Sequence, residues 1–163
     1  EGRAVARLSD LGWGQRLRTL LDGPDAPVPG ELVDAVAKVL AGWGWEQRPV
    51  AVVAMPARRR PQLVGSLAAE LARLGRLPLL GALQLRGPGP TGDPGGNSAF
   101  RLAGVWGRLG VVADLASRLH GIPGPVLLVD DLVDSRWTLT VAARELRAAG
   151  APAVLPFALA RVG

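Results

Sequence analysis

Val126-Leu-Leu-Val-Asp-Asp-Leu-Val-Asp-Ser-Arg-Trp-Thr138 is the stretch of sequence that decides the fold. Residues 125–129 are apolar and too few for a helix, which predicts a strand buried on both faces. Asp130 and Asp131 follow this run, and apolar residues then recur at helical spacing over 138–150. This order predicts a site where helix N-terminal amides bind a phosphate and the carboxylates bind ribose hydroxyls or a metal.

Length and composition indicate one domain with a substantial core. The chain has 163 residues, of which 48% are hydrophobic, and no apolar run is long enough to cross a membrane. It has no cysteine, only one histidine (His120) and no secretory signal pattern, which excludes disulfides, thiolate metal sites and histidine-based zinc clusters. We therefore expect a cytoplasmic protein. The first residue is Glu1, from which we expect a fragment of a longer chain.

The chain is strongly basic. It carries 19 Lys and Arg against 14 Asp and Glu, a net charge of +5, and a pI near 11.3. Such a balance is typical of nucleic-acid binding. However, Lys38 is the only lysine, and a GC-rich coding sequence would favour arginine regardless of function. Both explanations stay open at this stage.

The order of the predicted elements indicates an α/β fold. Residues 1–48 are expected to form an N-terminal helical segment that packs on an α/β core over 49–163, within a single structural domain. The core is expected to hold a mostly parallel, twisted sheet flanked by helices. The expected strands are 49–55, 77–85 (broken at Gly81), 103–112, 125–129 and 153–160, and the expected helices are 31–43, 63–74, 113–119 and 138–150.

Three loops are expected to meet at the carboxyl edge of this sheet, where open α/β sheets bind ligands. They are residues 56–61 with Arg58, Arg59 and Arg60, the Gly/Pro-rich loop 87–96, and residues 130–138. Three adjacent arginines at a strand end favour an anion site, and the alternative is a solvated basic turn.

Residues 129–138 resemble the diphosphoribosyl-binding signature of type I phosphoribosyltransferases. The resemblance implies that Asp130 and Asp131 hold the ribose 2′- and 3′-hydroxyls and that Asp134 acts as the catalytic acid–base group. Loop 56–61 would hold pyrophosphate and loop 87–96 would form a flexible hood. The 5′-phosphate would be cradled by Ser135, Arg136, Trp137 and Thr138. Mg²⁺ would enter only with the diphosphate.

Arg136 departs from this family pattern, which has glycine at its position. Glycine lets the backbone close around phosphate, often with a positive φ that a bulky side chain adopts only at a cost. We therefore expect the fold to be retained and the transferase activity to be impaired.

Nearly the whole chain resembles a narrower group. Residues 50–85, 96–106 and 124–160 are similar to competence-protein (ComF-like) modules. The N-terminal Gly2-Arg-Ala-Val-Ala-Arg-Leu-Ser-Asp-Leu-Gly-Trp-Gly14, together with 55–65, 96–106 and 128–143, resembles the C-terminal region of actinobacterial-type RecQ DNA helicases. Their ATP-dependent motor is absent here, since the chain has no G-x-x-x-x-G-K-[ST] loop, no Asp-Glu-x-His box and no zinc-binding cysteines.

Three functions follow as alternatives. The first is an accessory helicase domain that keeps an anion pocket for a phosphate-containing small molecule and binds DNA, with the rest of the helicase chain as its partner. The second is an active Mg²⁺-dependent transferase, and the third is an oligomerisation or docking scaffold. Trp137 is expected either to stack on an unpaired base or to pack on a neighbouring strand. The candidate DNA contacts are Arg58, Arg59, Arg60, Arg86, Arg101 and Arg136.

Overall fold

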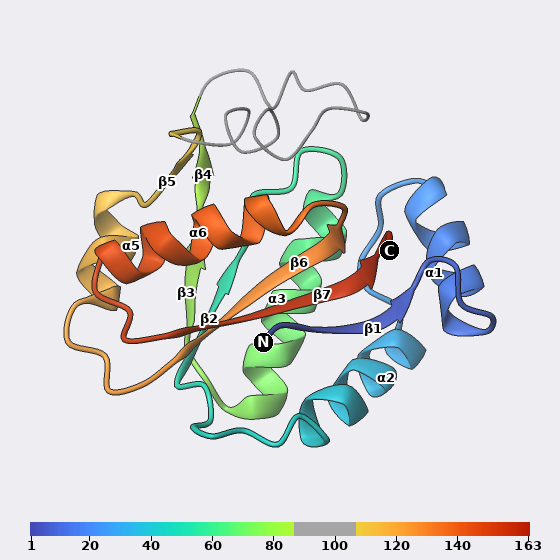
Figure 1. Ribbon diagram of the computed structural model, residues 1–163, viewed down its shortest axis with the longest axis horizontal. Helices are drawn as coiled ribbons and strands as arrows, with labels where there is room; N and C mark the ends of the chain where they lie inside the picture. The colour runs from blue at the N-terminus through green and yellow to red at the C-terminus, as the bar shows by residue number, and fades with distance from the viewer. Residues whose placement is uncertain (87–106) are drawn as a thin grey trace.

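The computed structural model describes residues 1–86 and 107–163, which form a five-stranded parallel sheet between two layers of helices (Figure 1). The strand order is β1-β7-β6-β2-β3, and every neighbouring pair is parallel. The expected α/β architecture is therefore confirmed. The strands are β1 (Arg3–Arg7), β2 (Ala51–Ala54), β3 (Leu79–Ala82), β6 (Val126–Val133) and β7 (Val154–Arg161).

Helices cover both faces of the sheet. Leu127 and Val129 of β6 pack into the apolar cluster beneath three helices, whereas Val126 and Leu128 pack into the cluster beneath the other two. This alternation is the period of two that a strand imposes on its side chains. None of the described helices is long and apolar enough to cross a membrane. The first layer holds α1 (Trp13–Asp22), α2 (Gly30–Ala41) and α3 (Pro61–Gly75), and the second holds α5 (Ala113–Leu119) and α6 (Arg136–Ala148).

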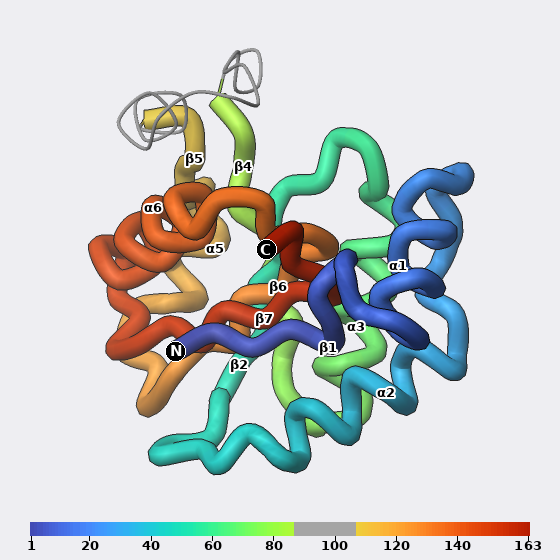
Figure 2. The backbone as a smooth tube through the Cα atoms, turned by 45° about the vertical axis from the view of Figure 1, so that its right-hand side comes forward, coloured from blue at the N-terminus to red at the C-terminus, as the bar shows by residue number. Residues whose placement is uncertain are grey.

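A short antiparallel ribbon stands apart from the main sheet (Figure 2). It pairs β4 (Gln84–Leu85) with β5 (Leu109–Gly110). The strand predicted over 77–85 is interrupted at Leu83, between β3 and β4, two residues after the break predicted at Gly81. The amide of Leu83 donates a hydrogen bond of 3.1 Å to the carbonyl of Ala54. Of the strand predicted over 103–112, the described residues 107–112 contribute only β5, whereas residues 103–106, with Trp106, lie outside the described residues. The loop predicted over 87–96 also lies outside them.

The central strand β6 is longer than its apolar run. It was predicted to end at Val129, but its ladder with β7 continues from Asp130, opposite Ala158, to Val133. Its pairing with β2 ends at Val129. The two acids therefore lie within β6, in the part that still pairs with β7 but no longer pairs with β2. The following helix also starts earlier than predicted, at Arg136 instead of Thr138.

The prediction that residues 1–48 are helical is wrong at the N-terminus. Residues Arg3–Arg7 form β1, which pairs in parallel with β7, and the first helix begins only at Trp13. Leu11, inside the segment predicted to be helical, is 90% exposed in the turn between β1 and α1. A five-residue strand leaves little periodicity to detect, and its hydrogen-bond partner lies about 150 residues away in the chain.

Helix α3 is capped from a distance. Its N-cap residue, Arg60, makes no side-chain capping bond. Instead, the carboxylate of Asp25, in the segment between α1 and α2, accepts hydrogen bonds from the amides of Gln62 at 2.9 Å and Leu63 at 3.0 Å. Two of the amides that a helix N-terminus leaves unpaired are thereby satisfied, and a negative charge faces the positive end of the helix dipole.

Replacing this cap should weaken the fold. We expect Asp25→Ala to lower the free energy of unfolding by about 1–2 kcal/mol, because both amides of the first turn lose their acceptor. Urea unfolding at neutral pH measures the change. Asp34→Ala, at an exposed position of α2, is the matched control and should stay within about 0.5 kcal/mol of wild type. Equal effects of the two substitutions would contradict the capping role.

Candidate phosphoribosyl-type site

The turn after β2 and the acids of β6 meet at one edge of the sheet. Strands β2 and β6 are parallel neighbours, so their carboxyl ends lie together. The arginine triplet follows β2, and its last member, Arg60, forms an ion pair with Asp131 of β6. The structure thus brings one arginine of the predicted anion loop into contact with one of the predicted ribose acids.

The Arg60–Asp131 pair is largely withdrawn from solvent. The two side chains are only 17% and 12% exposed. Nε of Arg60 donates to Oδ2 of Asp131, and its Nη1 donates to the carbonyl of Leu21 at 3.2 Å. A charge-assisted bond in such surroundings is stronger than a solvated one. In this structure, both groups find their partner within the chain.

Asp130 has a different environment. It is 9% exposed, and its Oδ1 accepts a hydrogen bond from the backbone amide of Asp131 at 2.9 Å. Burial, together with the neighbouring charge of Asp131, raises the pKa of Asp130 to about 7. Near neutral pH this carboxyl is therefore partly protonated.

The two acids do not point the same way. Because side chains alternate along a strand, Asp131 follows Leu127 and Val129 to the face covered by α3, where Arg60 meets it. Asp130 follows Val126 and Leu128 to the face covered by α6. Adjacency in sequence therefore does not give a single diacid surface for a ribose diol.

The loop after β6 adopts ordinary backbone geometry. Ser135, the N-cap residue of α6, is extended, with φ −116° and ψ 141°, and makes no side-chain capping bond. Among the described residues, Arg76 is the only non-glycine with positive φ, so Arg136 replaces the family's glycine without that strain. Asp134 and Arg136 are exposed, and Thr138 is half-buried.

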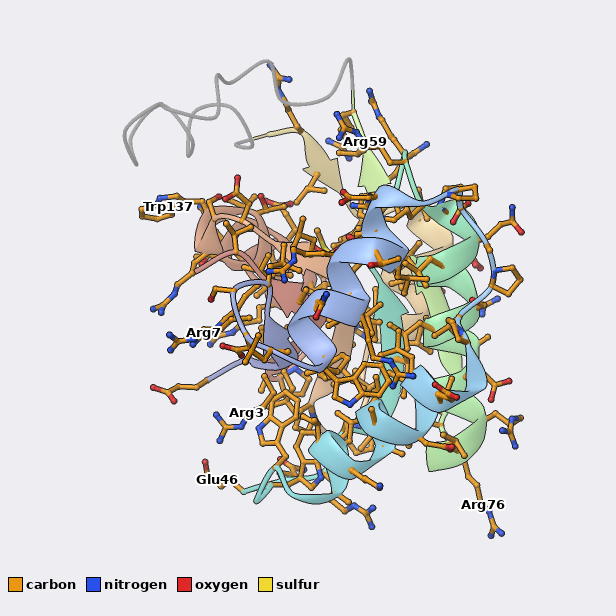
Figure 3. All side chains as sticks on the ribbon, turned by 90° about the vertical axis from the view of Figure 1, so that its right-hand side faces the viewer. Arg3, Arg7, Glu46, Arg59, Arg76 and Trp137 are labelled. Atoms are coloured by element: carbon orange, nitrogen blue, oxygen red, sulfur yellow. The ribbon has the colours of Figure 1, made fainter. Side chains whose placement is uncertain are left out.

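Trp137 is half-buried and packs against the apolar cluster beneath α5 and α6. This contact is the packing role that the sequence left open beside base stacking. Figure 3 shows the indole at the outer edge of the molecule, so a part of the ring still faces outward.

The candidate DNA contacts do not form one patch at the acid site. Arg58 and Arg59 are exposed beside Arg60, and Arg59 lies near the top of the molecule in Figure 3. Arg86 follows β4, where its amide donates to the carbonyl of Arg108 at 2.6 Å. Arg136 belongs to α6, and Arg101 lies outside the described residues. Their role in DNA binding stays a prediction.

Sequence reasoning missed the residues that complete this edge. Asp25 lies in the segment between α1 and α2, and the carbonyl of Leu21 belongs to the last turn of α1. No local pattern marks Asp25 as a cap, because the helix that it caps begins 36 residues later. Only the packing of α1 and α2 near α3 places it there.

The acid pair does not suit a resident divalent cation. Asp131 is already neutralised by Arg60, and burial favours the protonated form of Asp130. No group of three or more His, Asp or Glu side chains in the described ranges has the arrangement of a metal site. Mg²⁺ requires oxygen ligands with available charge.

The fold of this chain is similar to that of solved structures. The allosteric regulatory enzyme of purine biosynthesis is 25% identical with a TM-score of 0.51, over 84% of this chain and 28% of that one. Glutamine phosphoribosylpyrophosphate amidotransferase from B. subtilis is 22% identical with a TM-score of 0.49, and the match covers 84% of this chain and 29% of that one. Purine phosphoribosyltransferase from Pyrococcus horikoshii is 18% identical with a TM-score of 0.49, and the match covers 86% of this chain and 89% of that one.

The chain has the type I phosphoribosyltransferase fold, as expected from residues 129–138. It spans less than a third of the length of the first two enzymes. No family model and no curated protein matches it. The helicase relationship therefore stays a prediction from sequence.

The raised pKa of Asp130 predicts a pH-dependent stability. Folded Asp130 holds its proton up to about pH 7, whereas the unfolded group loses it near pH 4, so the free energy of unfolding falls as pH rises between these values. Asp130→Asn removes this titration. Relative to that variant, we expect wild type to lose about 2–3 kcal/mol between about pH 5 and pH 8 in urea unfolding.

Asp22→Asn, at an exposed position near the end of α1, is the control and should follow the wild-type curve. If the wild-type and Asp130→Asn curves run parallel over this pH range, Asp130 is not protonated in the folded protein.

Proposed function

We propose that this chain is a DNA-binding accessory domain of a RecQ-family ATP-dependent DNA helicase, built on a phosphoribosyltransferase fold that no longer catalyses transfer. The helicase relationship rests on the resemblance of Gly2–Gly14 and of the Ser135-Arg-Trp137 loop to that family. A role in DNA recombination and repair follows from such a parent. The observation that carries the loss of transfer is the Arg60–Asp131 ion pair.

A transferase would need both partners of this pair for its substrate. By family resemblance, the loop after β2 holds pyrophosphate and the acids hold ribose hydroxyls. Here Arg60 is bound to Asp131, and the first amides of α3 are bound to Asp25. Substrate would have to break these contacts before it could form its own with the same groups, which costs free energy.

Retained phosphate affinity is supported by the start of α6. Ser135 does not cap its amides, and Arg136 is exposed beside them. A phosphate-containing small molecule, or a phosphate of a nucleic acid, fits this chemistry. DNA is favoured as the main partner by the charge of +5, which attracts a polyanion without regard to base sequence.

Active transfer is the second candidate. It is favoured by the position of Asp130 and Asp131 at the carboxyl edge of the sheet and by the exposed Asp134 in the following loop. In that case the Arg60–Asp131 pair would open when substrate binds, and Mg²⁺ would arrive with the diphosphate. Binding and turnover experiments separate the two candidates.

DNA binding should be sequence-neutral and salt-sensitive. We expect a labelled duplex of about 20 base pairs to bind with a micromolar Kd at about 50 mM salt, and to weaken by about two orders of magnitude at 200 mM if about four phosphates are contacted. Fluorescence anisotropy with two unrelated sequences measures both properties. No binding up to about 100 μM protein at the lower salt would refute the proposal.

Transferase activity should be absent. With phosphoribosyl diphosphate, Mg²⁺ and a purine base, we expect no pyrophosphate release above the enzyme-free blank. Release that disappears in Asp134→Asn would establish the second candidate instead. The third possibility, a scaffold without DNA affinity, would show concentration-dependent self-association in analytical ultracentrifugation while failing the DNA experiment.

A further inference from the structure

A large groove lies between β1 and α6. Figures 1 and 2 show the course of these two elements, with the N-terminus at the start of β1. Its volume is about 1290 Å³, which exceeds the roughly 300–1,000 Å³ of a typical small-molecule pocket. Small side chains form much of its surface, including Ala4 and Ala6 of β1 and Ala143 of α6. The groove is therefore large enough, and lined by enough small side chains, to accommodate a segment of a polymer.

The groove is strongly positive. Its described lining includes two carboxylates, Glu1 and Asp10, and six arginines: Arg3, Arg7, Arg136, Arg144, Arg147 and Arg161. The arginines therefore outnumber the carboxylates in this lining; Glu1 lies 3.9 Å from Arg3, and Asp10 accepts a hydrogen bond from the backbone amide of Arg7 at 3.0 Å. Figure 3 shows Arg3 and Arg7 projecting from one side of the molecule, far from Arg76.

The arginines of α6 form a stripe. Arg136, Arg144 and Arg147, with Thr140, lie three or four residues apart, the spacing that puts side chains on one helix face. An arginine in the last turn of a helix also stabilises the helix dipole, which gives Arg147 a structural role of its own. That role does not apply to Arg136, which stands at the N-terminus, where a positive charge is unfavourable.

Strands β1 and β7 add a repulsive pair. Arg7 lies directly opposite Arg161 in the parallel ladder. Neither side chain forms an ion pair with any residue in the described ranges. Like charges on adjacent strands repel each other. A fold that retains such a pair beside an arginine stripe is suited to an anion that bridges the two.

We infer that this groove binds the phosphate backbone of duplex DNA; the inference rests on the proposed function and assigns its DNA contact to a surface distinct from the arginine triplet. Guanidinium groups bind phosphate oxygens in a bidentate way. Helix α6 is about 20 Å long. One strand of B-form DNA presents a phosphate about every 3.4 Å along the duplex axis, so a distance of this length spans about six phosphates of that strand.

Duplex DNA fits better than a single strand or a second copy of the chain. The described lining contains no aromatic side chain on which an unpaired base would stack. Self-pairing of the free edge of β1 in an antiparallel manner would place Arg3 opposite Arg7 at both ends, which is repulsive. An acidic peptide would also satisfy the charge of the groove, and the experiment tests this partner directly.

The experiment compares three double variants for binding to a labelled duplex over a range of salt. Arg7→Ala/Arg161→Ala should raise Kd at least about tenfold at about 100 mM salt and reduce the slope of log K against log salt by about two, because two phosphate contacts are lost. Arg48→Ala/Arg76→Asn removes two exposed charges elsewhere and should retain the wild-type slope. Arg58→Ala/Arg59→Ala tests the triplet.

Folding does not confound this comparison, since removing the Arg7–Arg161 repulsion should leave the thermal midpoint unchanged or higher. Arg147→Glu provides a second test on α6 and should weaken DNA binding more than the loss of one positive charge would.

An unchanged slope in the groove variant, with a reduced slope in the triplet variant, overturns the inference but keeps DNA binding. No binding by wild type refutes the proposed function itself. Tighter binding of a polyglutamate peptide than of duplex, lost in the groove variant, assigns the groove to an acidic protein partner instead.

Discussion

The guanidinium of Arg60 joins three parts of the chain that are far apart in sequence. It stands at the start of α3, binds Asp131 on the central strand and donates to the last turn of α1 through Leu21. Removing either member of such a partly buried pair leaves an uncompensated charge, which commonly costs about 3–5 kcal/mol. The carboxyl edge of the sheet is therefore closed by contacts within the chain. Asp25 completes this closure at the amides of α3.

The same sheet has a contrasting surface beside its first strand. At the carboxyl edge, the partly buried Arg60 is paired with the carboxylate of Asp131, whereas the groove between β1 and α6 has six arginines and two acids in its described lining. The opposed pair Arg7 and Arg161 weakens the local ladder rather than supporting it. Stability explains the first arrangement, and we propose affinity for an external anion as the reason for the second.

Periodicity was sufficient for the long elements. Strand β2, helices α2 and α3, and the unit of β6 and α6 were all predicted close to their observed positions, because apolar spacing dominates where an element is buried along its length. The short strand β1 was missed because its hydrogen bonds come from β7, at the other end of the chain. Strand β6 extends past its apolar run for the same reason: β7 continues the ladder.

The sequence by itself determined the alternating α/β order, the place of Asp130 and Asp131 after an apolar strand, and the excess of arginine. Tertiary structure alone decided that Asp131 is paired with Arg60 while Asp130 is buried with a raised pKa, since their environments depend on which helix covers each face of β6. It also decided that arginines from β1, α6 and β7 converge on one groove. Parallel pairing sets these contacts, because it brings together residues that no local pattern relates.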